Sequence, residues 1–223
     1  MSLPAEQFAP LQAVRGVRHC FTTRVPGIDV QADKAEALRR LDQVHHDLRL
    51  AYDVGDGPLM TAEQVHGNSL GIVDAALESD RCFAGCDGLI TNQPEVCLGI
   101  YVADCCAVYL VDPVRRAIGL VHSGRKGTEL GITANAIRLL NERFGSRPSD
   151  LVVQLSPCIR PPHYEVDFAA QIVSDCREAG VENAHDSGVC TACDLQRYYS
   201  YRAEKGKTGR MMALLAMTDP AER

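Results

Sequence analysis

Three short stretches of the chain carry residues that are suited to metal chemistry. They are Gln64-Val65-His66-Gly67, Ala103-Asp104-Cys105 and Val121-His122-Ser123-Gly124. Each places an imidazole or a thiol where an apolar segment ends and a turn begins. Zinc prefers such ligands, and a site with three protein ligands keeps its fourth position open for water or substrate. If the fold brings His66, Cys105 and His122 together, the sequence predicts a catalytic metal site.

Taken singly, each of these residues has a plainer explanation. A lone histidine after a strand is often a hydrogen-bonded structural residue, and a lone buried cysteine behaves as a small hydrophobe. Their shared position strengthens the metal interpretation, because Cys105 and His122 both end apolar strand candidates. Functional sites of open α/β sheets lie beyond the carboxyl ends of the strands. His66 is followed by Gly67, which allows a close backbone approach.

The chemistry expected of such a site is that of a metal-activated water. Zinc lowers the pKa of a bound water to roughly 7 and so supplies hydroxide at neutral pH. Cys105 would bind as a thiolate, which metal coordination enforces. Asp104, next to this ligand, could transfer a proton to a leaving group or could cap a neighbouring turn. The residue types alone leave both roles open.

An anion site is predicted close to His122. Gly124, Gly127 and Thr128 open a predicted helix whose free backbone N–H groups and positive dipole end suit a phosphate. Lys126 adds a positive charge there. An ordinary capped helix is the alternative. Arg24, which follows Phe21-Thr22-Thr23, is a second and weaker candidate for binding an anion or a ribose.

Ten cysteines would suggest disulfides in a small secreted domain, whereas in a longer chain without an export signal they are expected to stay thiols. Cys190 and Cys193 have the spacing of metal ligands but lack a second pair nearby, so a reduced surface turn is the expectation. The cysteines at positions 82, 86 and 97 do not form a recognisable cluster either.

The elements that must position these residues alternate between strands and helices. Strands are predicted at 17–24, 59–65, 69–73, 87–91, 96–103, 107–111, 117–121 and 151–155. The apolar periodicity predicts helices over 32–50, from Gly124 to a cap at Gly145, and from a cap at Asp167 to a point before Gly180. The tail, 198–217, is predicted as strand, turn and strand. This order indicates an α/β fold of mixed-sheet α+β layers.

Composition narrows the class of protein. The 223 residues are 46% hydrophobic, no linker or repeat is visible, and a single domain over 1–223 with a core at roughly 17–216 is expected. A net charge of -6 with scattered basic residues argues against nucleic-acid binding. The N-terminus lacks the features of a secretory signal, and the longest apolar run is too short to span a membrane. The expected location is the cytoplasm.

Taken together, the motifs resemble the YfiH-like family. The resemblance covers roughly residues 17 to 216 and includes the three stretches above, Asp87-Gly88-Leu89-Ile90-Thr91, Gly127-Thr128, Pro157-Cys158-Ile159, Tyr164-Glu165-Val166, Tyr199-Ser200-Tyr201-Arg202 and Thr208-Gly209-Arg210. This family was labelled multicopper polyphenol oxidoreductase (laccase) and is also described as purine nucleoside phosphorylase with adenosine deaminase activity.

The resemblance implies a single α/β domain with zinc, or copper, held by His66, Cys105 and His122. It implies phosphorolysis of purine nucleosides, including adenosine, inosine and methylthioadenosine, and hydrolytic deamination of adenosine. The partners would be a nucleoside and phosphate, with no nucleic acid or membrane, for a monomer or homodimer. The predicted catalytic residues are Asp104 and Cys105. The predicted substrate- and phosphate-binding residues are Arg24, Gln64, Lys126 and Thr128.

The chain departs from the family pattern near the site. Arg125 stands where the family usually has a tryptophan, so a cation replaces a large ring that could line a base or sugar pocket. The turn after Arg24 lacks the usual Gly-Gly pair. The loop 156–163 ends in Pro-Pro-His where the family often has paired cysteines.

Three rival functions remain open at this point. A metal-free hydrolase could use Cys105 as nucleophile and His122 as base. A copper polyphenol oxidase would need several copper ions and more histidine ligands than the seven histidines of this chain readily supply. In a non-enzymatic protein, the same residues would form a metal site that stabilises the fold, or a binding pocket.

Overall fold

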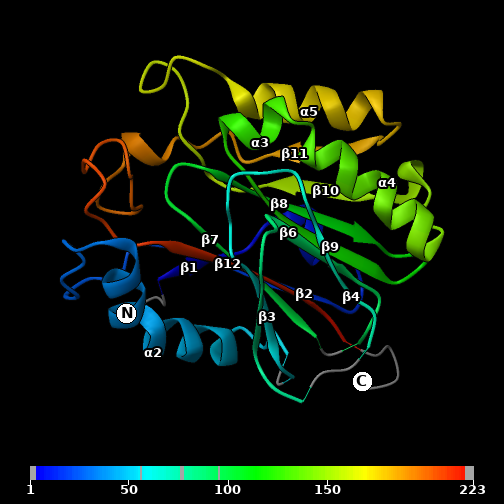
Figure 1. The fold of residues 1–223 in the computed structure, drawn as a ribbon, viewed down its shortest axis with the longest axis horizontal. Coiled ribbons are helices and arrows are strands. Elements are labelled where there is room, and N and C mark those ends of the chain that lie inside the picture. The colour runs from blue at the N-terminus through cyan, green and yellow to red at the C-terminus, as the bar shows by residue number, and fades with distance from the viewer. Residues whose placement is uncertain (1–3, 56, 76–77, 95, 219–223) are drawn as a thin grey trace.

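Two six-stranded sheets form the centre of the molecule (Figure 1). The computed structural model describes residues 4–55, 57–75, 78–94 and 96–218; the outermost residues of the predicted 1–223 domain lie outside this range. The first sheet has the order β1 (Ala5–Glu6), β2 (Val17–Thr22), β12 (Met211–Met217), β7 (Cys97–Val102), β3 (Leu59–Ala62) and β5 (Arg81–Phe83). The second has the order β11 (Asn183–Asp186), β10 (Val152–Leu155), β8 (Cys106–Asp112), β9 (Ala117–Ser123), β6 (Gly88–Thr91) and β4 (Gly71–Val73).

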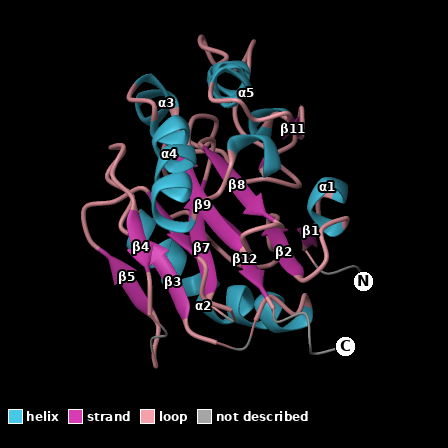
Figure 2. Cartoon of the chain, turned by 90° about the vertical axis from the view of Figure 1, so that its right-hand side faces the viewer, coloured by secondary structure: helices cyan, strands magenta, loops and turns pink. Residues whose placement is uncertain are grey.

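Helices cover the outer faces of this pair of sheets. The long helix α2 (Lys34–Ala51) lies along the first sheet, while α4 (Ile132–Phe144) and α5 (Phe168–Glu178) lie over the second (Figures 1 and 2). The short helices α1 (Ala9–Gln12) and α3 (Arg125–Glu129) and the 3-10 turns η1 (Pro148–Asp150) and η2 (Thr191–Cys193) complete the secondary structure of the described residues. The predicted mixed-sheet α+β architecture is confirmed.

The core follows from the alternation of side chains along buried strands. In β12, Ala213 and Leu215 face the core between the two sheets, whereas Met212 and Leu214 face the other side of the first sheet. In β8, Tyr109 contributes to the core between the sheets and its neighbours to the core under α4 and α5. Both faces of these strands are therefore buried, which explains why their sequences read as continuous apolar runs.

The helix predictions hold where caps and periodicity agree. Asp33 caps α2 by accepting a hydrogen bond from the Glu36 N–H, Asp167 caps α5 through the Ala170 N–H, and Gly145 ends α4 in the left-handed conformation. The single helix predicted after Gly124 was wrong. Gly131, with φ of 71°, divides it into α3 and α4, and Leu130 at this break is exposed.

The tail prediction was wrong in its first half, because residues 198–210 are irregular with turns at 201–206, and only β12 is a strand. In place of hydrogen bonds to a neighbouring strand, this segment has hydrogen bonds to one of its own side chains, Glu204. The Glu204 carboxylate accepts from the Ser200 N–H, the Thr208 hydroxyl and Arg24. The predictions also missed β1, β5 and β11, which are short and mostly lack buried apolar side chains. No helix among the described residues has the length and apolar character required to cross a membrane.

Acid is expected to weaken the fold through His19. This residue of β2 is buried, and its Nε2 accepts a hydrogen bond from the Phe8 N–H at 2.8 Å, which requires a neutral ring. Burial lowers the pKa of His19 from 6.5 to about 4. Between these values the unfolded chain binds the proton and the folded chain does not, so stability is lost as pH falls from 6.5 towards 4. We expect His19 to account for about 2 kcal/mol of lost unfolding free energy between pH 7 and pH 5.

Urea denaturation at the two pH values measures this effect. The His19→Asn variant should show a smaller loss of unfolding free energy than the unsubstituted chain, whereas His46→Asn, at an exposed position of α2, should behave like the unsubstituted chain. An identical pH dependence in the His19 and His46 variants would show that His19 does not carry the effect.

Candidate metal centre

The structure brings His66, Cys105 and His122 together, although they lie far apart in the sequence. Their ligand atoms all lie within 4.8 Å of one another, and the two imidazole rings approach edge to face with centroids 4.8 Å apart. His66 lies in the turn after β3, Cys105 lies between β7 and β8, and His122 lies in β9. The predicted convergence is therefore confirmed as geometry.

Asp87 organises two of these three residues. Its side chain is fully buried directly before β6. Asp87 Oδ1 lies 2.9 Å from His122 Nδ1 and accepts from the His66 N–H at 2.8 Å, while Oδ2 accepts from the Gly67 N–H at 2.7 Å. With Nδ1 engaged, His122 keeps Nε2 for a ligand role. A carboxylate behind a ligating histidine is the usual outer partner in metal sites.

The backbone at the site is held in uncommon conformations. Gln64, His66 and Asp104 have φ values of 65°, 61° and 82°, in the left-handed region that L side chains rarely adopt. Such strain persists only where surrounding contacts impose it, and it concentrates at functional sites. Gln64 supplies some of these contacts, because its amide bonds both the Tyr101 carbonyl, at 2.6 Å, and the Tyr101 N–H, at 3.0 Å.

Gly124 leaves the space that the Cys105 sulfur occupies. A Cβ at position 124 would lie 2.5 Å from Cys105 Sγ, so any larger residue would displace the thiol. This close approach explains the glycine that follows His122-Ser123 in the sequence. It also fixes the sulfur on the side of the chain that faces the two imidazoles.

The electrostatics of the cluster favour a thiolate. Burial raises the pKa of the Cys105 thiol, but hydrogen bonds with His122 and His66 outweigh burial and lower that pKa to about 6. Burial lowers the pKa of His122, but Asp87 and Cys105 raise it to about 9. For Asp87, burial opposes ionisation, yet the bonds from His122, Gly67 and His66 keep its pKa below the ordinary value.

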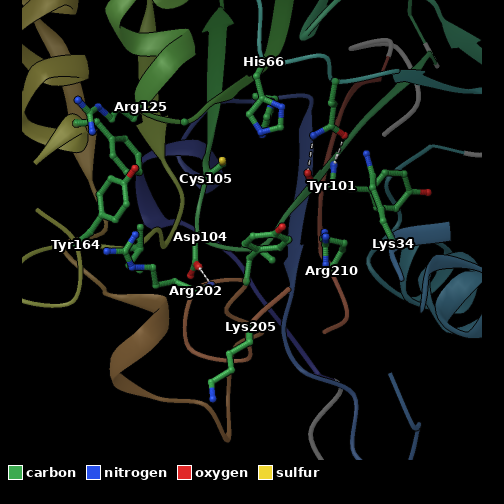
Figure 3. A pocket seen from close by; sticks show the side chains of 17 residues that line it. Lys34, His66, Tyr101, Asp104, Cys105, Arg125, Tyr164, Arg202, Lys205 and Arg210 are labelled. Atoms are coloured by element: carbon green, nitrogen blue, oxygen red, sulfur yellow. Dashed lines mark hydrogen bonds between the residues drawn. The ribbon is translucent and has the colours of Figure 1, made fainter. Parts of the chain in front are cut away.

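The three candidate ligands border a cavity of about 740 Å³. Figure 3 shows Arg125, Tyr164 and Arg202 on one side of Cys105 and Tyr101, Lys34 and Arg210 on the other. The lining combines aromatic rings with several cationic side chains. The other lining residues are Gln64, His66, Ala103, Asp104, His122, Gly124, Ile159, Phe168, Tyr201 and Lys205. A cavity of this size with rings and a few polar groups suits a small organic ligand.

Two cations at this cavity were not predicted from the sequence. Arg210 is buried, donates to the Thr208 and Gly209 carbonyls, and forms no ion pair with a carboxylate in the part of the chain that the structure describes. Lys34, at the start of α2, lines the same side of the cavity. Burial lowers the pKa of Lys34, and the charge of Arg210 lowers it further. Arg210 stood in a recognised motif, but nothing in the sequence pointed to Lys34.

Arg24, predicted to bind an anion, does not line the cavity. Its guanidinium donates to the Tyr198 carbonyl and, at 2.7 Å, to Glu204, and it lies over the Tyr199 ring. These contacts tie Arg24 to the turns at 198–210, which present Tyr201, Arg202 and Arg210 to the cavity. In this structure Arg24 therefore supports the turns that form one wall of the cavity.

Lys126 and Thr128, the residues predicted to bind an anion at the start of α3, lie outside the cavity lining as well. Lys126 is exposed and does not line the cavity. The Thr128 hydroxyl is buried, donates to the Gly124 carbonyl and lies 2.9 Å from Ser123 Oγ. Because α3 spans only Arg125–Glu129, its dipole is small. Of this segment, Gly124 and Arg125 reach the cavity.

Asp104 and Gln64 line the cavity, but their polar atoms are already engaged. Asp104 Oδ1 accepts from the Thr191 hydroxyl and Oδ2 from the Arg202 N–H, each at 2.7 Å. These bonds support the turn-capping role for Asp104. The Gln64 amide is used on the Tyr101 backbone. Both residues hold neighbouring segments in place around the candidate ligands.

The donor set fits a transition metal. Two imidazoles and a thiol with a lowered pKa converge, Asp87 orients one imidazole, and Gly124 makes room for the sulfur. Nitrogen and sulfur ligands select borderline or soft cations over magnesium or calcium. The three protein ligands would leave coordination positions open towards the cavity.

Comparison with known proteins gives a consistent result. Residues 18–173 and 166–218 match the family described as multi-copper polyphenol oxidoreductase laccase. Purine nucleoside phosphorylase YlmD of Geobacillus stearothermophilus is 31% identical over 194 residues, which cover 69% of this chain and 70% of the relative. A purine nucleoside phosphorylase of Corynebacterium glutamicum is 28% identical over 237 residues, covering 90% and 94%. The crystal structure of hypothetical protein YfiH from Bacillus licheniformis superposes with a TM-score of 0.76 at 26% identity, covering 97% of this chain and 100% of that chain.

Proposed function

The chain belongs to the multi-copper polyphenol oxidoreductase laccase family, the YfiH-like family expected from its motifs, and we propose that it is a metal-dependent purine nucleoside phosphorylase. Relatives that carry the name purine nucleoside phosphorylase support this proposal. The observation that carries it is the shared cavity, in which three metal-type ligands face aromatic rings and cations.

The cavity lining supplies side chains suited to both reactants, the purine nucleoside and phosphate. Tyr101, Tyr164, Phe168 and Tyr201 offer rings against which a purine can pack. Arg210 and Lys34 offer positive charge for phosphate. In phosphorolysis, a phosphate oxygen forms a bond to C1′ of the ribose as the bond from C1′ to the purine nitrogen breaks. The purine keeps the electron pair of the broken bond and takes up a proton.

We propose zinc as the resident metal, with copper as the alternative, held by His66, Cys105 and His122. A bound zinc ion supplies a Lewis acid and a water that ionises near neutral pH. The chain's own residues do the positioning: Asp87 orients His122, and Asp104 fixes the Arg202 backbone through its N–H. We propose Asp104 as a positioning residue rather than a proton donor, because both of its oxygens already accept hydrogen bonds.

We extend the proposal to hydrolytic deamination of adenosine in the same cavity. In that reaction water adds at C6 of the purine, the bond from C6 to the amino nitrogen breaks, and ammonia leaves. The candidate ligands border the cavity beside the rings proposed to hold the base, which supports one site for both reactions. Adenosine, inosine and methylthioadenosine are the substrates proposed.

A nucleoside panel on protein of measured metal content tests the function. Free purine should appear from adenosine, inosine and methylthioadenosine only when phosphate is present, together with one equivalent of sugar phosphate. Ammonia should appear from adenosine without phosphate. Purine release that is independent of phosphate would overturn the phosphorylase proposal. The proposal would also fail if the protein did not act on nucleosides and instead consumed oxygen with a phenol in proportion to its bound copper.

The Arg210→Gln variant is expected to raise KM for phosphate by roughly tenfold to a hundredfold, with a smaller effect on KM for the nucleoside. Removing this cation leaves phosphate without the buried guanidinium proposed to bind it. Phosphate titration at saturating nucleoside gives the measurement. Arg210→Lys, which keeps the charge but not the planar fork, should recover part of the loss.

Lys126→Gln is the matched control. It removes a cation that was predicted from the sequence to bind phosphate but that lies outside the cavity lining. KM for phosphate should stay unchanged in this variant. Equal effects of the Lys126 and Arg210 substitutions would indicate long-range electrostatics and refute a phosphate contact at Arg210.

A further inference from the structure

A second group of metal-type ligands lies outside the cavity. His163 Nε2, Cys190 Sγ and Cys193 Sγ lie within 4.8 Å of one another, and the Cys193 sulfur is 4.0 Å from the His163 nitrogen. The mechanism above uses none of these side chains. The sequence showed the cysteine pair but gave no reason to connect it with His163.

Local structure explains why the three side chains meet. The turn η2 (Thr191–Cys193) winds the chain so that Cys190 and Cys193, three residues apart, point to the same side. An isolated bridge between Cys158 and Cys190 places this turn beside the loop that follows β10, and that loop carries His163. Hydrogen bonds from the Thr191 N–H to the Cys158 carbonyl and from the His163 N–H to the Arg160 carbonyl fix both segments.

We propose that His163, Cys190 and Cys193 form a second transition-metal site, one that takes zinc. Two sulfurs and one imidazole are the ligand types of structural zinc sites. Metal–ligand bonds of about 2.3 Å for sulfur and about 2.0 Å for nitrogen place two ligands of one tetrahedral ion about 3.5–3.8 Å apart. The observed separations of up to 4.8 Å therefore need a closing movement of only about 1 Å.

A disulfide between Cys190 and Cys193 is the alternative to metal binding at this turn. It would account for Cys190 and Cys193 but not for the imidazole that lies against them. Both cysteines are free thiols, and all three side chains retain some exposure to solvent. With three protein ligands, one position of a tetrahedral ion would stay open to solvent.

The second site has a direct connection to the first. Thr191, between the two cysteines, is buried, and its hydroxyl donates to Asp104 Oδ1 at 2.7 Å. Asp104 adjoins Cys105, so a metal that fixes η2 would also fix the segment that leads to the first ligand set. A metal at the second site would therefore stabilise the segment that carries Asp104 and Cys105 at the cavity wall.

Zinc stoichiometry of the full chain tests the proposal. In a Cys105→Ala background, which removes a ligand of the first site, the protein should retain one equivalent of zinc after loading and gel filtration. Adding Cys193→Ser should abolish that retention, and adding Cys82→Ser, at an exposed cysteine outside both clusters, should not. In the otherwise unsubstituted chain, Cys193→Ser should lower the zinc content from two equivalents to one.

Cobalt substitution provides a readout that does not depend on stoichiometry. Cobalt bound by two thiolates gives a strong thiolate-to-metal charge-transfer band, which should persist in the Cys105→Ala variant and weaken sharply with either Cys193→Ser or His163→Ala. The proposal is overturned if the Cys105→Ala protein binds no metal, or if it binds equally well without Cys193. Thiol titration that finds Cys190 and Cys193 joined in freshly purified, metal-free protein would also overturn it.

Discussion

Replacing Cys105 by alanine is expected to abolish metal retention at the first site and to lower kcat/KM for phosphorolysis at least about a thousandfold, or about 4 kcal/mol of transition-state stabilisation. The sulfur is one of three converging ligand atoms, and alanine would leave two imidazoles that bind a metal far more weakly. Metal analysis and steady-state kinetics on the same preparation measure both effects.

The neighbouring Cys106 supplies a matched control. Its side chain faces the core under α4 and α5 and lies near Ser156, away from the ligand set. Cys106→Ala should lower stability modestly but keep the metal and most of the activity. Activity that survives exhaustive chelation of the unsubstituted protein, yet is lost on alkylation of Cys105, would instead support a metal-free thiol hydrolase.

Asp87→Asn is expected to lower metal affinity or kcat/KM by tenfold to about a hundredfold, the usual effect of removing an outer carboxylate behind a ligating histidine. The substitution removes the charge opposite His122 Nδ1 and places an amide group where the carboxylate accepted three hydrogen bonds. Both His122 and the turn that carries His66 would lose their orientation. Competition titration with a chromophoric zinc chelator measures the affinity.

Asp112→Asn is the control for a purely structural effect. Asp112 is also a fully buried aspartate, and it accepts from the Val114 and Arg115 N–H groups in a turn that does not contribute to the cavity lining. Its replacement should lower the melting temperature without changing metal affinity. If Asp87→Asn likewise lowered the melting temperature and left metal affinity unchanged, Asp87 would have no role in orienting the ligands.

The sequence predicted the ligand set because each member follows a recognisable strand. Cys105 lies between two apolar runs, and both runs are buried strands, β7 and β8. His122 is at the end of a third such run, in β9. Because β3 and β7 are parallel neighbours in the first sheet, the residues that follow them, His66 and Cys105, lie at the same edge. His122 comes from the second sheet, and only the packing of the two sheets brings it to that edge.

Sequence patterns carry little information where tertiary contacts decide a side chain's partners. Arg24 and Thr128 were predicted to bind substrate or phosphate, and in the structure they hydrogen-bond to Glu204 and to the Gly124 carbonyl. The role of Lys34 depends on where α2 docks, which no local pattern encodes. Likewise, His163 approaches the cysteine pair only through the bridge between Cys158 and Cys190, and a sequence shows no such pairing.

The same limit explains the tail. Tyr198, Tyr199 and the residues around them have the composition of a strand. Glu204 nevertheless collects hydrogen bonds from three groups at once and closes the segment into turns. The composition of a segment indicates its strand preference, but it does not show that one half-buried carboxylate, Glu204, accepts hydrogen bonds that hold the segment in another conformation.

The most direct measurement of the central claim is an anomalous-difference map from crystals of the protein loaded with zinc or with copper, recorded on both sides of each absorption edge. We expect a strong peak within bonding distance of His66, Cys105 Sγ and the His122 Nε2 atom, with Asp87 still bound to Nδ1. Loaded crystals without a peak among these three side chains would contradict this expectation.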